Sequence, residues 1–242
     1  MATNWREKFQ ALRTRLLQRP SSKGNPASRE DGETTPVPPL PAPRSRSIAP
    51  AHTPTPRERA TVSINLGIDF GTSFTKVCFR DIGSEHSGVI AFGGSSVDKA
   101  MIPTIVIVAP DGRLHLQNGP AAEGQITVRY LKMRVAGLGF GAPLPKVGDI
   151  NLNEREPSQA LAAWFLAEAI ARAKAWISEN EADRTRGRNI LWSANVGVPV
   201  EHYDSPSLAV FREILAVAWE WTKHFETPPQ TLADAIASYR AI

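Results

Sequence analysis

The chain has 242 residues, of which 42% are hydrophobic and 21% are charged. This composition suits one full-sized globular domain, or two smaller ones, with a real core, and it excludes fibrous proteins. No apolar run approaches the roughly 20 residues of a membrane-spanning helix, and the start lacks the apolar core of a secretory signal. We therefore predict a cytoplasmic protein without a transmembrane segment.

The net charge of +4 is unevenly distributed along the chain. Residues 1–60 carry 11 Lys+Arg against 5 Asp+Glu, whereas the remaining residues carry 17 against 19. The globular part is therefore slightly acidic. This argues against a fold that binds nucleic acid specifically and assigns the basic charge to an N-terminal tail.

Residues 1–19 predict a short basic amphipathic helix. Large apolar residues recur at helical spacing, with basic residues elsewhere on the helical wheel. The apolar positions are Trp5, Phe9, Leu12 and Leu16. Three interpretations stay open: a marginal helix without a function of its own, a docking helix for a partner protein, and an interfacial contact with a membrane.

Residues 20–60 predict a disordered, proline-rich linker. The segment contains 10 prolines and almost no large apolar side chains. Such a composition buries too little surface to offset the entropy lost on ordering. The stretch "PVPPLPAPR" also has the proline spacing of a polyproline helix that docks on an aromatic groove, although a plain linker is the commoner use of such sequences.

From Val62 onward the sequence predicts short strands separated by turn residues. The β-branched runs cover residues 62–68, 74–80, 87–92 and 102–108. The Pro110-Asp111-Gly112 turn predicts a further hairpin, because Asp-Gly is a strong hairpin signal. The single cysteine, Cys78, falls in the second run, where we expect a buried apolar thiol.

The second half of the chain predicts helices around a strand. Apolar periodicity predicts a helix over residues 158–178, and the continuous apolar run over residues 190–200 is typical of a strand buried on both faces. Ser205 as N-cap and Pro206 at the first helical position open another helix. The order of elements predicts an α/β fold.

The stretch "GIDFGTSFTKV" carries the clearest chemical signal. A glycine-bearing turn between two strands can direct successive backbone N–H groups at one anion, and Thr72 and Ser73 add hydroxyl donors beside Gly71. Asp69 can hold Mg²⁺ directly or through its waters. Lys76 is left unassigned because it can point to the other side of the ladder. Read alone, the pattern also fits an ordinary hairpin turn.

Several blocks in the same order resemble the actin-like ATPase superfamily, and within it the DnaK-type heat-shock chaperones. "GIDFGTSFTKV" resembles the family's first phosphate motif, and "IPTIVIV" resembles the strand that follows it. "NGPAAEGQ" is similar to a Gly-x-x-Ala segment, and "ITVRYLKMRVAG" to the stretch with the catalytic lysine. "ILWSANVGVPVEHYDSPSLAVFREILAVAW" is similar to the family's Val-Pro-Ala strand, its loop and the next helix.

The resemblance implies an RNase H-like, actin-like ATPase lobe over residues 61–242, with a mixed five-stranded type of sheet and flanking helices. It implies ATP or ADP and Mg²⁺ as cofactors. Asp69 takes the Mg²⁺-water role, the Gly71 turn with Thr72 and Ser73 contacts the β- and γ-phosphates, and Lys132 positions the attacking water. Counting from Thr127 places Lys132 on the family's lysine, whereas counting back from Gly137 places Met133 there.

The resemblance covers only the first of the family's two lobes. A second Asp-x-Gly-Thr turn, a catalytic carboxylate and a Gly-Gly adenosine motif follow in the family, and none occurs before Ile242. We therefore expect this chain to bind ATP weakly and to hydrolyse it hardly at all without a second lobe. The resemblance implies coupling of the nucleotide state to a protein client or co-chaperone.

Three alternative functions stay open. The first is an actin-like filament or scaffold protein whose assembly is tuned by ATP. The second is a sugar kinase of the same superfamily, which the Val-Pro loop disfavours. The third is a non-enzymatic remnant that binds a partner through the helix of residues 1–19.

Overall fold

The computed structural model describes residues 60–93, 97–117, 119–137, 141–197, 206–223 and 228–242. All of these belong to one compact unit, Pro54–Ile242. The predicted helix of residues 1–19 and the linker up to residue 59 lie outside the described residues, as does the predicted N-cap Ser205.

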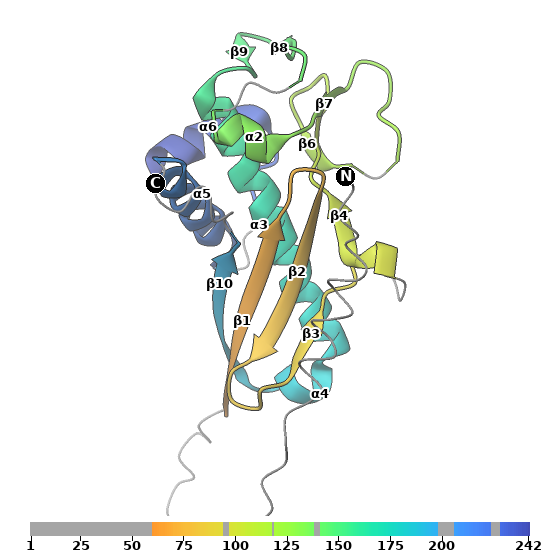
Figure 1. Cartoon of the computed structure of the whole chain (residues 1–242), viewed down its shortest axis with the longest axis vertical. Helices are drawn as coiled ribbons and strands as arrows, with labels where there is room; N and C mark the ends of the chain where they lie inside the picture. The colour runs from red at the N-terminus through yellow and green to blue at the C-terminus, as the bar shows by residue number, and fades with distance from the viewer. Residues whose placement is uncertain (1–59, 94–96, 118, 138–140, 198–205, 224–227) are drawn as a thin grey trace, which may run out of the picture. The chain divides into compact units, whose positions relative to one another are not determined.

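A mixed sheet of five strands organises the domain (Figure 1). Its strand order is β10-β1-β2-β3, and β4 pairs with β2 beyond that path. β1 runs parallel to β10, whereas the other pairs are antiparallel. The strands are β1 (Thr61–Phe70), β2 (Phe74–Asp81), β3 (Ser87–Val89), β4 (Met101–Pro103) and β10 (Asn189–Val196).

A second, smaller sheet is formed by strands that lie between β4 and β10 in the chain. Its order is β6-β5-β7, with both pairs antiparallel. The strands are β5 (Val106–Val108), β6 (Leu114–Leu116) and β7 (Ile126–Val128), and a separate pair joins β8 (Lys146–Val147) to β9 (Ile150–Asn151). The predicted hairpin is confirmed, because Val108 pairs with Leu114 and Gly112 has a φ of 82°. The single strand predicted over residues 102–108 is instead two strands, one in each sheet.

Helices flank the sheets, and the long α3 is central. The helices are α2 (Leu131–Val135), α3 (Arg155–Asn180), α4 (Ala182–Thr185), α5 (Pro206–Lys223) and α6 (Leu232–Ala241), with a 3₁₀ turn η1 (Val97–Ala100). Along its first four turns α3 is buried almost all round, as expected for a helix that contacts neighbours on several sides. The prediction of an α/β domain with a mixed sheet and flanking helices is therefore confirmed.

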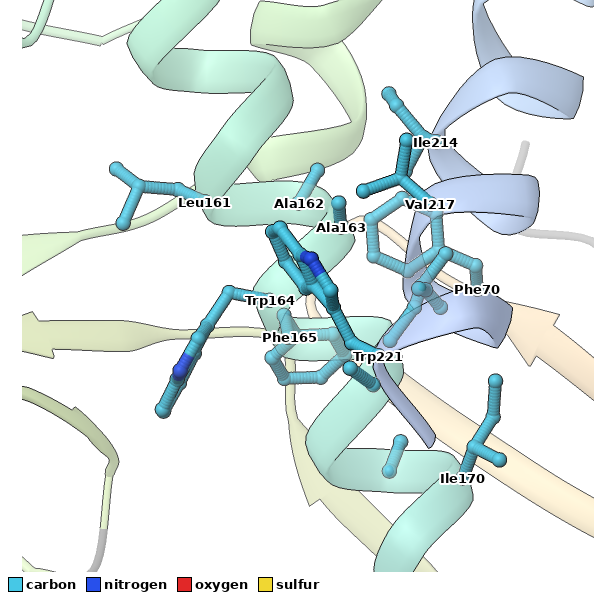
Figure 2. Close-up of a cluster of buried hydrophobic side chains, with 14 of the residues drawn as sticks. Phe70, Leu161, Ala162, Ala163, Trp164, Phe165, Ile170, Ile214, Val217 and Trp221 are labelled. Atoms are coloured by element: carbon cyan, nitrogen blue, oxygen red, sulfur yellow. The ribbon is translucent and has the colours of Figure 1, made fainter. Parts of the chain in front are cut away.

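The main core lies between one face of the five-stranded sheet and helices α3 and α5. Figure 2 shows the Phe70 side chain reaching from β1 toward these helices. Its ring centroid lies 5.9 Å from that of Phe165 on α3 and 6.5 Å from that of Phe211 on α5. Aromatic pairs at such separations add to the stabilisation from burial alone. The residue before the glycine turn is thus anchored in the core.

The strand predicted over residues 190–200 differs from the expectation. β10 ends at Val196, its residues alternate between exposed and half-buried, and within the described residues it is an edge strand. Leu191, which the apolar run placed inside, is 55% exposed. For residues 190–196 the prediction of burial on both faces was wrong, because among the described residues helices pack against one face of this sheet; residues 198–200 lie outside the described part.

Cys78 is also placed differently from the prediction. It is exposed, and its thiol donates weakly to the Gly67 carbonyl at 3.4 Å. Its neighbours Val77 and Phe79 point to the core instead, each at most 2% exposed. A β-strand alternates its faces at every residue, so Cys78 belongs to the face opposite the helices.

Candidate functional site

The turn between β1 and β2 needs glycine at position 71. A Cβ atom built on Gly71 would collide with the carbonyl oxygen of Phe74, which is backbone and cannot rotate away. The two strands pair up to Phe70 and Thr75, so the turn is tight. The glycine in the motif is therefore required by the close approach of the chain to itself.

Thr104 holds this turn from the side. Its backbone N–H donates to the Ser73 carbonyl at 2.9 Å, and its hydroxyl lies 2.9 Å from that of Thr75. Both threonines are fully buried, so their hydroxyls satisfy one another away from water. Sequence reasoning missed this residue, although it follows directly after the Pro103 that ends β4.

Asp69 lies on the open face of the sheet, the face opposite α3 and α5. It is exposed at the end of β1, and its partner across the antiparallel ladder is Lys76. Residues directly opposite in a ladder project to the same side. Lys76, whose side the sequence left open, therefore lies on the same face of the sheet as Asp69.

The structure brings Lys132 into the electrostatic range of Asp69. Lys132 lies on the short helix α2 and is half-buried, and burial lowers the pKa of its ammonium group. The Asp69 carboxylate acts in the opposite direction and raises the pKa of Lys132. Asp69 and Lys132, which are 63 positions apart in the chain, therefore influence each other electrostatically.

A cavity of about 370 Å³ lies beside the turn. Its walls come from the turn, the junction of β4 and β5, the end of β6 and the segment between β7 and α2. They are formed by Thr72, Ser73, Phe74, Pro103, Thr104, Ile105, Gln117, Arg129 and Tyr130. The structure thus gathers Thr72 and Ser73 in this cavity, whereas Asp69, Gly71 and Lys132 are not among its walls. The volume falls within the usual range for small-ligand sites.

The residues at the turn suit a Mg²⁺ ion that is also bound by the phosphates of a ligand, and not one held by the protein alone. Among the described residues no group of three or more His, Cys, Asp or Glu side chains could hold a metal ion by itself. Mg²⁺ commonly takes one or two carboxylates and completes its shell with water and substrate phosphates. Asp69 supplies one exposed carboxylate, which suits that arrangement and not a closed protein cage.

A larger cavity, of about 460 Å³, lies elsewhere, and none of the site residues predicted from the sequence lines it. Its walls include Glu168 and Arg172 of α3, whose side chains pair at 3.6 Å. The charges in that cavity are already matched to each other. The smaller cavity, with an arginine and several hydroxyl groups, is the better candidate for an anionic ligand.

Comparisons with protein-family models, with curated proteins and with solved structures found no match to this chain. The family resemblance therefore rests on the sequence motifs alone. Within the described part of the chain, no helix has the length and apolar character needed to span a bilayer.

Proposed function

We propose that this domain is the phosphate-binding lobe of an actin-like, DnaK-type ATPase, and that the β1–β2 turn contacts the phosphate chain of ATP. The observation that carries the proposal is that Thr72 and Ser73 of the glycine turn line one cavity, while the charge of Asp69 on the adjoining strand acts on Lys132. The motif resemblance requires Asp69 and Lys132 to act on one nucleotide, although they are far apart in sequence. A mixed sheet with flanking helices also agrees with the fold that the resemblance implies.

In this proposal each residue at the turn has a defined task. The backbone after Gly71 and the hydroxyl groups of Thr72 and Ser73 donate hydrogen bonds to phosphate oxygens. Asp69 accepts hydrogen bonds from the waters of Mg²⁺, which, when bound, neutralises charge that develops on the phosphates. Lys132 orients the attacking water. Phosphoryl transfer depends on this kind of positioning and charge stabilisation more than on covalent chemistry by the protein.

The site as described favours weak binding. Asp69 and Ser73 are exposed, so their interactions with phosphate compete with water at high dielectric. We expect a dissociation constant for Mg-ATP on the order of 0.1–1 mM, or roughly −4 to −5.5 kcal/mol. The cytoplasmic location and the coupling of nucleotide to a client or co-chaperone belong to the same proposal.

The test is calorimetric titration of the full chain with ATP, with and without Mg²⁺. Asp69→Asn should weaken binding by about 10-fold to 100-fold in the presence of Mg²⁺, the range expected for loss of a charged hydrogen-bonding group. Asp111→Asn is the matched control, because Asp111 is an exposed carboxylate in another turn, paired with Arg113 at 2.6 Å. It should leave ATP binding unchanged.

Gly71→Ala tests the turn itself. The added methyl group collides with the Phe74 carbonyl, so the turn must open, and we expect ATP binding to fall below detection while far-UV circular dichroism retains the helical signal. The proposal fails if the wild-type chain does not bind ATP at millimolar concentration. It fails equally if Asp69→Asn and Asp111→Asn bind ATP alike.

A further inference from the structure

Arg129 is a cation in the cavity beside the turn that the motif resemblance does not assign. It is exposed, and it lines the cavity together with Thr72 and Ser73. No Asp or Glu is among the described residues that line this cavity, and within the described ranges no carboxylate forms an ion pair with Arg129. The guanidinium charge is thus available to a ligand.

The backbone around Arg129 is held firmly. Val128, the residue before it, pairs with Val106 in the second sheet. The Arg129 carbonyl accepts a hydrogen bond from Nε of Arg134 at 3.1 Å, and Arg134 also donates to the Ala142 carbonyl at 3.3 Å. Although the Arg129 side chain is long, its starting point beside the cavity is therefore fixed.

Tyr130, the next residue, adopts a backbone conformation that residues other than glycine rarely take. Its φ is 58° and its ψ is 35°, the left-handed region, at the start of α2. Such a conformation is energetically unfavourable for a residue with a side chain and persists only where the surroundings impose it. Here it turns the chain from β7 into α2. Arg129, before the turn, lines the cavity, and Lys132, after it, is influenced by the charge of Asp69.

We propose that Arg129 is a second phosphate-binding cation, which contacts the polyphosphate chain of the ligand from the cavity that Thr72 and Ser73 line. This inference rests on the proposed function, since it deepens the same site. A guanidinium group presents a planar set of N–H donors that matches two phosphate oxygens at once, and hydroxyl groups beside it can complete the shell of donors. The ligand class is a di- or triphosphate, either free or attached to a nucleoside.

The test compares two titrants, Mg-ATP and inorganic tripolyphosphate, by calorimetry at low salt. Arg129→Gln should weaken the binding of both by about 10-fold or more, and Arg129→Lys should restore only part of the loss because it lacks the planar fork. Arg113→Gln is the control. Arg113 is likewise exposed, but it pairs with Asp111 outside the cavity, so its loss should change binding less than twofold.

The two titrants separate the inference from the proposed function. Wild-type and Arg129→Gln proteins with equal ATP affinity would overturn the role of Arg129 and leave the ATP site standing. The Arg129 inference would be supported and the ATPase proposal overturned if Arg129→Gln weakened the binding of tripolyphosphate while Asp69→Asn left the affinity for ATP unchanged. A wild-type chain that binds neither titrant would overturn both. Because Arg129 is exposed, we expect its variants to melt at the wild-type temperature.

Discussion

The two faces of the five-stranded sheet differ in almost every respect, although the same strands supply both. One face packs against α3 and α5 and carries residues such as Leu66 and Phe70, both fully buried. The open face carries Asp69, Lys76 and Cys78, all of them exposed. Stability therefore depends chiefly on one set of alternate residues, and the proposed chemistry on the other.

The open face is not featureless, because its polar groups pair across strands. The Asn65 amide donates to the Ser193 hydroxyl at 2.8 Å, and Asn195 donates back to the Asn65 side-chain oxygen at 3.2 Å. These bonds lie between the parallel neighbours β1 and β10. Substitutions on this face should thus alter binding with little change in stability, and substitutions on the covered face should do the reverse.

The largest effect we predict is at Phe70, on the covered face. Phe70→Ala removes a fully buried ring from between Phe165 and Phe211 and should cost about 3–5 kcal/mol of unfolding free energy. Urea denaturation measures this cost. Phe74, at the other end of the same turn, is 51% exposed, so Phe74→Ala should cost less than about 0.5 kcal/mol. Equal losses from the two changes would remove the contrast between the faces.

A smaller, pH-dependent effect on stability is expected at Lys174, which lies on α3 and is buried against α5. Lys174 is 3% exposed, its ammonium donates to the Thr222 carbonyl at 2.8 Å, and it lies 4.6 Å from the ring centroid of Trp219. Burial lowers the pKa of Lys174 to about 8, below the usual 10.5. Between these two values the unfolded chain holds more protons than the folded one, so the contribution of this residue to stability rises with pH.

Lys174→Met supplies the reference for that prediction. The unfolding free energy of the wild type, minus that of Lys174→Met, should increase as the pH rises from about 8 to about 10.5, by at most about 1.4 kcal/mol per pH unit. Chemical denaturation of both proteins at several pH values measures it. A difference that stays flat, or that falls with pH, would contradict a lowered pKa.

The smallest effect is expected at Cys78, on the open face. The exposed thiol should react with one equivalent of Ellman's reagent in the native protein, and Cys78→Ser should change the unfolding free energy by less than about 0.5 kcal/mol. Because the chain has a single cysteine, the reaction reports on this position alone. Labelling that requires denaturant would place Cys78 on a covered face.

Much of the local structure could be predicted from the sequence. The Asp111-Gly112 turn, the helix at residues 158–178 and the start of a helix at Pro206 follow from turn chemistry, periodicity and proline geometry, and the structure has all three. Thr104 could not be predicted, because a hydrogen bond to Ser73 depends on where β4 lies beside β2. Arg129 was missed for the same kind of reason, since nothing in its own sequence neighbourhood indicates a cavity.

The sequence by itself determined that a glycine turn with an adjacent acid and two hydroxyl residues joins two strands, because close backbone approach and strand alternation are local properties. Only the tertiary structure decided which alternate residues are covered. An apolar run such as residues 190–196 reads the same whether helices lie on one face of a sheet or on both, and Cys78 reads as buried until the helices are placed. The neighbourhood of Asp69 and Lys132 was likewise decided by the packing of α2, since charges act through space and not along the chain.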